Sequence, residues 1–152
     1  MSTSDHTPNE PVDILIVEDN PGDVRLMQEA FGMTDSDVRF RTVSDGAEAA
    51  EYFRRCRTGA VDGYPDVILL DLNLPKKSGH ALLELLGNEW EHPTPPVLVL
   101  SSSTADDDIH KSYDRNANAY LVKPDSPTEF DSLAKAIESF WIDRVQHPPS
   151  PA

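Results

Sequence analysis

Short apolar runs alternate in this chain with stretches of helical periodicity, and this alternation limits the possible folds more than any other feature of the sequence. Four runs are apolar on consecutive positions and rich in Val, Ile and Leu, and a further stretch alternates between apolar and polar residues. Consecutive apolar positions over so few residues are typical of strands covered on both faces, as in a parallel sheet. We therefore predict strands at Val12–Val17, Val38–Val43, Val67–Leu70, Val97–Leu100 and Ala119–Val122.

Between the predicted strands, apolar residues recur at intervals of three and four, which is the spacing of one helix face. The helical stretches are residues 24–31, 47–57, 81–86, 106–116 and 130–141. A strand and a helix thus alternate five times along the chain. Such alternation implies right-handed crossovers and a parallel sheet with helices on both faces, so the predicted fold class is α/β.

The length and composition indicate one compact domain. The chain has 152 residues, of which 38% are hydrophobic, and domains commonly contain roughly 100 to 200 residues. Residues 1–11 and 146–152 are polar and contain prolines, which is typical of flexible tails. We therefore predict a single domain over residues 12–145.

Several features favour a soluble protein of the cytoplasm. No stretch approaches the roughly 18 consecutive apolar residues of a membrane helix. The opening residues, MSTSDHTPNE, lack the basic start and the apolar run of a secretory signal. The single cysteine, Cys56, allows no internal disulfide, in agreement with a reducing compartment.

The net charge is strongly negative. Asp and Glu number 27 against 13 Lys and Arg, which gives a net charge of −14. An acid excess repels phosphate backbones and anionic lipids, so we expect neither nucleic acid nor a membrane as a partner. We interpret the Asp-rich, Lys-poor composition as halophilic, because salt near 1 M shortens the Debye length to about 3 Å and screens the self-repulsion. An ordinary acidic bacterial protein is the alternative.

Polar side chains follow four of the predicted strands. In an open parallel sheet, ligands bind beyond the carboxyl ends of the strands. The polar residues at those ends are Glu18, Asp19, Asp71, Asn73, Ser101 and Lys123. Each of them alone also has a structural explanation, since Asp and Asn commonly form loops and a Lys before a Pro is often at the surface. Their joint placement after four different strands favours a functional site.

Clustered carboxylates of this kind indicate phosphoryl transfer with a divalent cation. They repel one another and raise each other's pKa unless a cation lies among them, and hard oxygen ligands favour Mg²⁺. Carboxylates also act as nucleophiles in phosphoryl transfer. Asp71 is the best candidate for the nucleophile because it ends the most apolar strand. Lys123 and Ser101 can then contact the phosphoryl oxygens, as a point charge and a hydroxyl donor.

A resemblance to the receiver domain of two-component response regulators covers about residues 12–145. It rests on the segments ILIVEDNPGDVRL, DVILLDLNLPKKSGHALLELL, PVLVLSSS and ANAYLVKP. The motifs DNPGD and LNLPKKSG, together with the pair Phe140 and Trp141, are similar to those of stand-alone regulators paired with phytochrome-type sensor histidine kinases. The resemblance implies a flavodoxin-like (βα)5 doubly wound parallel sheet of strand order 2-1-3-4-5.

The resemblance also implies a phosphoacceptor and a metal site. Asp71 matches the aspartate that takes a phosphoryl group from a histidine kinase. Asp19 matches the acid that ligates Mg²⁺ together with Asp71, and Glu18 matches its neighbour, which acts through water. The backbone carbonyl of Asn73 matches a further protein contact to the metal.

Three other residues match the switching parts of the family. Lys123 matches the lysine of the acid pocket, and Ser101 matches the hydroxyl that turns toward the phosphoryl group. Tyr120 matches the aromatic that reorients with that hydroxyl, although a half-buried strand aromatic is its structural alternative. The signalling face would combine the fourth helix, the fifth strand and the fifth helix.

The implied function is that of a single-domain response regulator. It would be a phosphoacceptor switch that assists its own phosphorylation and dephosphorylation, with a sensor histidine kinase and an unknown downstream protein as partners. A Mg²⁺-dependent phosphohydrolase is one alternative, but it would need an acid where Asn73 stands. A receiver-like scaffold that takes no phosphate is the other, but the acid pocket has lost no residue.

Three large apolar residues follow one another at Phe140, Trp141 and Ile142. A single helix face cannot bury all three, so at least one should face solvent or a partner. We interpret them as a surface for a homodimer or for kinase docking. The alternative is that Trp141 folds back over the core.

Overall fold

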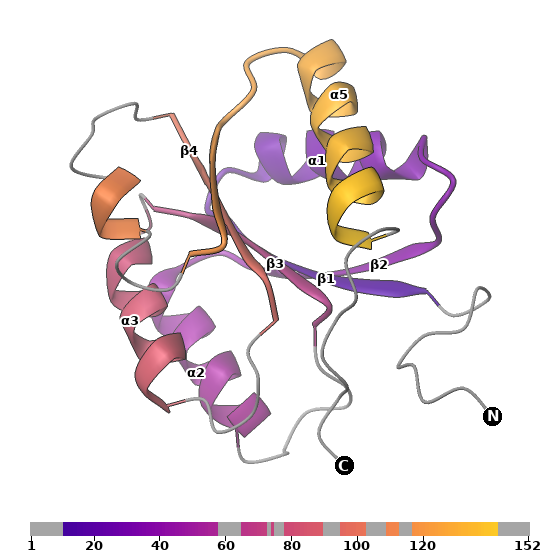
Figure 1. Cartoon of the computed structure of the whole chain (residues 1–152). Helices are drawn as coiled ribbons and strands as arrows, with labels where there is room; N and C mark the ends of the chain where they lie inside the picture. Colours follow the sequence, from indigo (N-terminus) through magenta and orange to yellow (C-terminus); the bar gives the residue numbers. More distant parts are fainter. Residues whose placement is uncertain are drawn as a thin grey trace, which may run out of the picture.

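A five-stranded parallel sheet forms the centre of the molecule (Figure 1), with the strand order β2-β1-β3-β4-β5. The computed structural model describes residues 11–57, 65–72, 74, 78–89, 95–102, 109–112 and 117–142. The strands are β1 (Val12–Val17), β2 (Val38–Val43), β3 (Val67–Asp71), β4 (Val97–Ser101) and β5 (Ala119–Val122). The predicted strands, the flavodoxin-like α/β class and the strand order are thus confirmed.

Helices cover both faces of the sheet, with α1 and α5 on one face and α2 and α3 on the other (Figure 1). The helices are α1 (Pro21–Gly32), α2 (Gly46–Arg57), α3 (Gly79–Glu89) and α5 (Pro127–Ile137), and a π-helical segment, η1 (Glu138–Ile142), continues α5. Of the helix predicted at 106–116, residues 109–112 are helical and the others lie outside the described residues. Of the helical stretch predicted at 130–141, the part up to Ile137 is α-helix and the rest belongs to the π-helical segment η1.

Helix α1 begins directly beyond the end of β1 because Asn20 caps it. The side-chain oxygen of Asn20 accepts hydrogen bonds from the backbone N–H groups of Gly22 and Asp23, at 2.9 and 3.3 Å. Pro21 occupies the first helical position, where no backbone N–H is needed. Ser126 caps α5 in the same way. The first turn of α1 is thereby fixed against the carboxyl end of the sheet.

Successive residues of the central strands point to opposite faces of the sheet. Leu15 and Val17 belong to the core beneath α2 and α3, whereas Ile14 and Ile16 belong to the core beneath α1 and α5. Strands β3 and β4 are buried along their whole length, which explains why both sequences are almost continuously apolar. The edge strand β2 keeps exposed positions, in agreement with its alternating sequence.

The register of the sheet brings the polar strand ends together. Val17 of β1 pairs with Leu70 of β3, and Ser101 of β4 pairs with Val122 of β5. Because the strands are parallel, the residues that end or follow them meet at one edge of the sheet. The candidate site lies at that edge.

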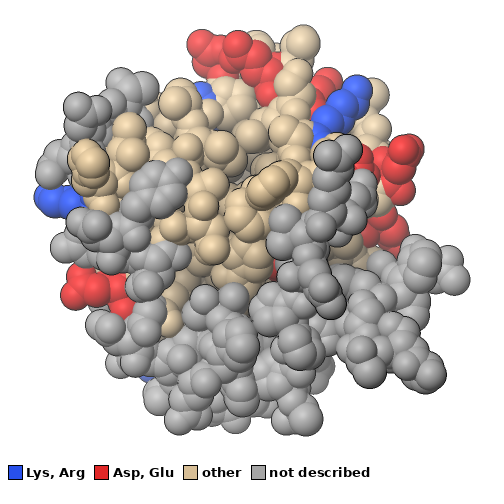
Figure 2. All heavy atoms as spheres, in the orientation of Figure 1, with Lys and Arg blue, Asp and Glu red and all other residues tan. Residues whose placement is uncertain are grey.

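The structure bears on three further predictions, which concern the acidic surface, the absence of a membrane helix and the tails of the chain. Figure 2 shows acidic side chains in several separate places on the described surface, with few basic ones between them. Within the described ranges, no helix combines the length and the apolar character needed to cross a lipid bilayer. The predicted tails lie outside the described residues except for Pro11, so the boundaries at 12 and 145 stay predictions.

Gly79, the first residue of α3, packs so closely against the end of β3 that a side chain has no room. A Cβ atom there would lie 2.6 Å from the Cα of Leu72 and 2.7 Å from the carbonyl oxygen of Asp71. Gly79→Ala must therefore shift the backbone beside Asp71. We expect the free energy of unfolding, measured by urea titration, to fall by about 1–3 kcal/mol.

Gly32, at the end of α1, provides the matched control. A Cβ atom there would meet nothing within 4 Å. Gly32→Ala should leave the free energy of unfolding unchanged or raise it by up to about 1 kcal/mol, because Ala is the better helix former. Equal losses in the two variants would contradict the packing explanation.

Candidate functional site

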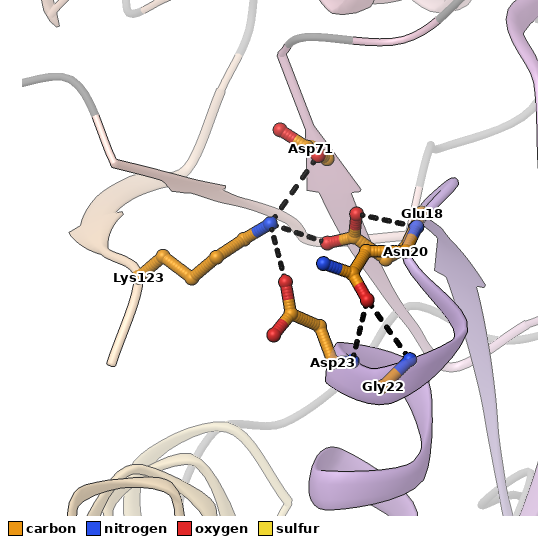
Figure 3. Close-up of polar contacts among 6 residues, drawn as sticks. All are labelled: Glu18, Asn20, Gly22, Asp23, Asp71 and Lys123. Atoms are coloured by element: carbon orange, nitrogen blue, oxygen red, sulfur yellow. Dashed lines mark hydrogen bonds and ion pairs between the residues drawn. The ribbon is translucent and has the colours of Figure 1, made fainter. Parts of the chain in front are cut away.

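An ammonium group surrounded by carboxylates lies at the carboxyl edge of the sheet (Figure 3). The Nζ atom of Lys123 lies 2.7 Å from Oε1 of Glu18, 3.0 Å from Oδ2 of Asp23 and 3.3 Å from Oδ2 of Asp71. Glu18 follows β1, Asp71 ends β3 and Lys123 follows β5. Asp23 belongs to the first turn of α1. Four separate elements thus supply the four charged groups.

These charged groups differ in their exposure to water. The side chains of Glu18 and Asp71 are buried, at 7% and 6% exposure, and that of Lys123 is 17% exposed. Asp23 lies nearer the rim, and Asp19 is exposed. Charges buried to this degree interact strongly, and leaving one of them without a partner is costly. The contacts of Lys123 therefore offset the free-energy cost of burying the ionised carboxylates of Glu18 and Asp71.

Glu18 is the most strongly perturbed acid of the site. Burial raises its pKa from 4.5 to about 7, aided by a hydrogen bond and charge repulsion from Asp71 and opposed by the Lys123 ammonium. The one ammonium group of Lys123 faces three carboxylates and does not offset the effect of burial on Glu18. A second positive charge among the carboxylates would favour their ionised forms.

The lysine itself stays charged. Burial alone would lower the pKa of Lys123, but its hydrogen bonds to Glu18 and Asp23 and the charges around it outweigh burial and raise that pKa. The ammonium group is therefore a fixed positive charge at physiological pH.

Three carboxylates of the site are placed so that they could hold a metal ion. Glu18, Asp19 and Asp71 each offer an oxygen atom, and these atoms all lie within 4.8 Å of one another. Hard oxygen donors at this spacing suit a small divalent cation such as Mg²⁺. The donor set thus fits the metal predicted from the sequence. Asn73, predicted to add its backbone carbonyl, lies outside the described residues.

A pocket of about 460 Å³ opens beside these carboxylates. It lies between α1 and the ends of β1 and β2, with Glu18 and Asp19 in its wall. The other lining residues are Pro21, Val24, Arg25, Gln28, Thr42, Val43 and Ser44. Glu18 and Asp19 are therefore reached from an open cavity.

Comparison with known proteins identifies the family. Residues 14–137 match the response regulator receiver domain. The chain belongs to this family. Members of this receiver family act as phosphoacceptor switches and hold a divalent metal in an acidic pocket. The resemblance predicted from the four sequence segments is confirmed.

Two relatives match this receiver over most of their length. Response regulator Rcp1 of Synechocystis sp. is 35% identical over 140 residues, which cover 92% of this chain and 95% of Rcp1. The probable methanogenesis regulatory protein FilR2 of Methanothrix harundinacea is 35% identical over 133 residues, which cover 88% of this chain and 85% of FilR2.

Two solved structures share the fold of this receiver. The phosphorylated cyanobacterial phytochrome response regulator RcpA is 39% identical and has a TM-score of 0.81. The Mn²⁺-bound form of Rcp1 is 34% identical and has a TM-score of 0.79. Each match covers 91% of this chain and 99% of the other. The predicted similarity to phytochrome-type regulators is thus confirmed in both sequence and structure.

The two predicted switch residues of this receiver lie on β4 and β5. Ser101 ends β4 and is fully buried, and its carbonyl oxygen accepts a hydrogen bond from the backbone N–H of Lys123 at 2.8 Å. Tyr120 is half-buried on β5 and packs against the core beneath α2 and α3. The proposed reorientation of either side chain stays a prediction.

Sequence reasoning missed two residues of the site, Asn20 and Asp23. The backbone N–H of Asn20 donates to Oε2 of Glu18 at 3.1 Å, and the Asn20 side chain caps α1. Asp23 lies in the first helical turn and contacts Lys123. An Asn-Pro pair directly after a strand end is the available signal, because it starts a helix there and brings its first turn to the site.

The structure places the two aromatic residues of η1 differently, and the homodimer or kinase-docking surface stays a prediction. Phe140 is 55% exposed, whereas Trp141 is half-buried and packs against the core beneath α1 and α5. Their ring centroids lie 5.0 Å apart in an edge-to-face arrangement. The side chain of Ile142 lies outside the described residues. Trp141 therefore folds back over the core and Phe140 faces solvent.

The raised pKa of Glu18 gives the receiver a defined pH dependence without metal. Between pH 4.5 and about 7 the folded protein binds more protons at Glu18 than the unfolded chain does, so the contribution of Glu18 to stability falls as the pH rises through this range. We expect Glu18→Gln to flatten the decline in the free energy of unfolding, measured in EDTA at several pH values.

The control for this experiment is Glu29→Gln on the exposed surface of α1. It should keep the wild-type slope. A Glu18→Gln variant with the same pH slope as the wild type would contradict the description of Glu18.

Proposed function

We propose that Asp71 accepts a phosphoryl group from a sensor histidine kinase, and that the modified receiver signals through a changed protein surface. The observation that carries this proposal is the position of the Asp71 carboxylate. It ends a buried strand, lies 3.3 Å from the Lys123 ammonium and belongs to a group of carboxylates that could hold a divalent cation. Membership of the receiver family supports the same function.

The proposed reaction transfers a phosphoryl group between two side chains. An oxygen of the Asp71 carboxylate attacks phosphorus on the donor imidazole of the kinase, and the P–N bond breaks. The electron pair of that bond stays on the imidazole nitrogen, and Asp71 becomes an acyl phosphate. Lys123 offers a positive charge within reach of the new phosphoryl oxygens, and the buried strand holds Asp71 in place.

The site residues would share the binding of Mg²⁺ and phosphate. Asp19 and Asp71 would ligate the metal directly, Glu18 would act through water, and Asn73 would contribute its backbone carbonyl. Bound Mg²⁺ would supply positive charge to the phosphoryl oxygens in the transition state. Together with Lys123, these residues would let the receiver assist both its own phosphorylation and its own dephosphorylation.

The proposed switch residues, Ser101 and Tyr120, lie on β4 and β5. Ser101 would turn its hydroxyl toward the phosphoryl group, and Tyr120 on β5 would reorient with it. Val122 exposes an apolar side chain on the same edge strand, next to Lys123. We infer that the helical segment 109–112, β5 and α5 form the face to which the downstream protein binds.

The proposed partners follow from the relatives and from the charge. RcpA is by name a cyanobacterial phytochrome response regulator, so we infer a phytochrome-type kinase for this receiver. A net charge of −14 disfavours nucleic acid and anionic membranes and agrees with a salt-rich, halophilic cytoplasm. The exposed ring of Phe140 supports a homodimer or a kinase contact through η1.

Asp71→Asn tests the phosphoacceptor. We expect the wild-type protein, incubated with Mg²⁺ and acetyl phosphate, to gain one hydroxylamine-sensitive phosphate, as seen by intact-mass spectrometry. The variant should gain none, because an amide is no nucleophile for this transfer. Asp35→Asn, on the exposed turn after α1, should be labelled like the wild type.

Two outcomes would contradict this assignment. Equal labelling of Asp71→Asn and the wild type would place the acceptor at another residue. A wild-type protein that releases phosphate rapidly and never carries it would favour a phosphohydrolase instead.

Mg²⁺ should stabilise the folded receiver. A ligand that binds only the folded state, at ten times its dissociation constant, adds about 1.4 kcal/mol to the free energy of unfolding. We therefore expect the melting temperature to rise by roughly 4 °C under that condition, and to rise less in Asp19→Asn, which lacks one metal carboxylate. Asp35→Asn should respond like the wild type. No shift in moderate salt would argue against the metal site.

A further inference from the structure

Asp23 contacts the lysine of the site but does not belong to the group of acids that could hold a metal. Its Oδ2 atom lies 3.0 Å from Nζ of Lys123 (Figure 3). In the part of the chain that the structure describes, the metal-type cluster consists of Glu18, Asp19 and Asp71. The Asp23 carboxylate therefore pairs with the Lys123 ammonium and lies outside the acid group that could hold a metal.

The Lys123 ammonium already uses its three N–H donors. An ammonium group has three donors, and Lys123 contacts three carboxylates. The contact with Asp71, at 3.3 Å, is longer than those with Glu18 and Asp23, at 2.7 and 3.0 Å. A phosphoryl group on Asp71 would bring additional oxygen acceptors. The ammonium could serve them only by weakening one of its present contacts.

The position of Asp23 is fixed by the start of α1. Its backbone N–H donates to the Asn20 side chain at 3.3 Å, and the Asn20 backbone N–H donates to Glu18. The Asp23 side chain is 23% exposed, compared with 7% for Glu18 and 6% for Asp71. A fixed negative charge at the rim also repels an approaching anionic phosphodonor.

We propose that Asp23 is a positioning residue that competes with the incoming phosphoryl group for the Lys123 ammonium and thereby slows phosphorylation of Asp71. This inference rests on the proposed function of Asp71. The competition would act through Lys123, with Asp23 touching neither the metal nor the reacting atoms. Phosphorylation would then release Asp23 and loosen the link between β5 and the first turn of α1.

Asp23→Asn is the direct test. Labelling by acetyl phosphate at saturating Mg²⁺ should be roughly three- to tenfold faster than in the wild type, because one charged contact to the ammonium is weakened. Asp23→Glu restores the charge and should stay within about twofold of the wild-type rate. Asp125→Asn removes the same charge from an exposed position two residues beyond Lys123 and should also change the rate less than about twofold.

Two further measurements separate competition for the ammonium from other causes. The dissociation constant of Mg²⁺, measured by calorimetry, should change less than about twofold in Asp23→Asn, whereas general disruption of the pocket would weaken binding. The acceleration should also appear with phosphoramidate, a less anionic donor, because the released ammonium serves either donor. An acceleration confined to acetyl phosphate would reduce the role of Asp23 to repulsion and overturn the proposal.

The outcomes for this inference differ from those for the proposed function. A wild-type protein that takes no phosphate at Asp71 would overturn the proposed function. Normal wild-type labelling, with Asp23→Asn labelled at the same rate or more slowly, would overturn the role of Asp23 alone. An equal acceleration in Asp125→Asn would show that net charge, and not the contact with Lys123, controls the rate.

Discussion

The contact of one ammonium group with three carboxylates is the interaction on which the rest of this site depends. Lys123 reaches Glu18, Asp23 and Asp71 from the end of β5, so it links the first strand, the first helix and the central strand. Buried carboxylates without a partner would be costly or would take up protons. Three carboxylates surround the one ammonium group, and burial, aided by the neighbouring Asp71, raises the pKa of Glu18 even with Lys123 in place. This imbalance favours binding of a cation.

The sheet makes this arrangement possible because it fixes the ends of its strands. Strand β3 is buried over its whole length, so Asp71 stands on a backbone that is held by packing on both faces. The crowding of Gly79 against Leu72 and Asp71 holds the first residue of α3 close to the same strand end. A carboxylate in such a position has little freedom to move away from Lys123. The rigid core thus positions the charged groups, and the pocket beside Glu18 and Asp19 leaves access from solvent.

Most of the fold and part of the site could be predicted from the sequence, for physical reasons that also set the limit. Continuous burial leaves apolar runs such as those of β3 and β4, and the residues that follow the runs must lie at one edge of a parallel sheet. Asp23 escaped this reasoning because a helical residue reaches the site only if its helix is suitably rotated, and rotation depends on tertiary packing. The sequence could not decide whether Trp141 is buried or exposed, because the π-helical turn after Ile137 changes the angular spacing of side chains.

The same contacts suggest how a change at Asp71 would spread. Lys123 links α1 to the end of β4, since its ammonium contacts Asp23 and its backbone N–H donates a hydrogen bond to the carbonyl oxygen of Ser101. In the proposed reaction, new phosphoryl oxygens draw the ammonium toward Asp71 and alter both links together. Because packed cores respond by discrete rearrangement more than by gradual deformation, a small displacement of this one side chain can bias the exposed face that includes Val122. In the proposed reaction, the surface of the receiver would therefore respond to phosphorylation through the contacts of Lys123.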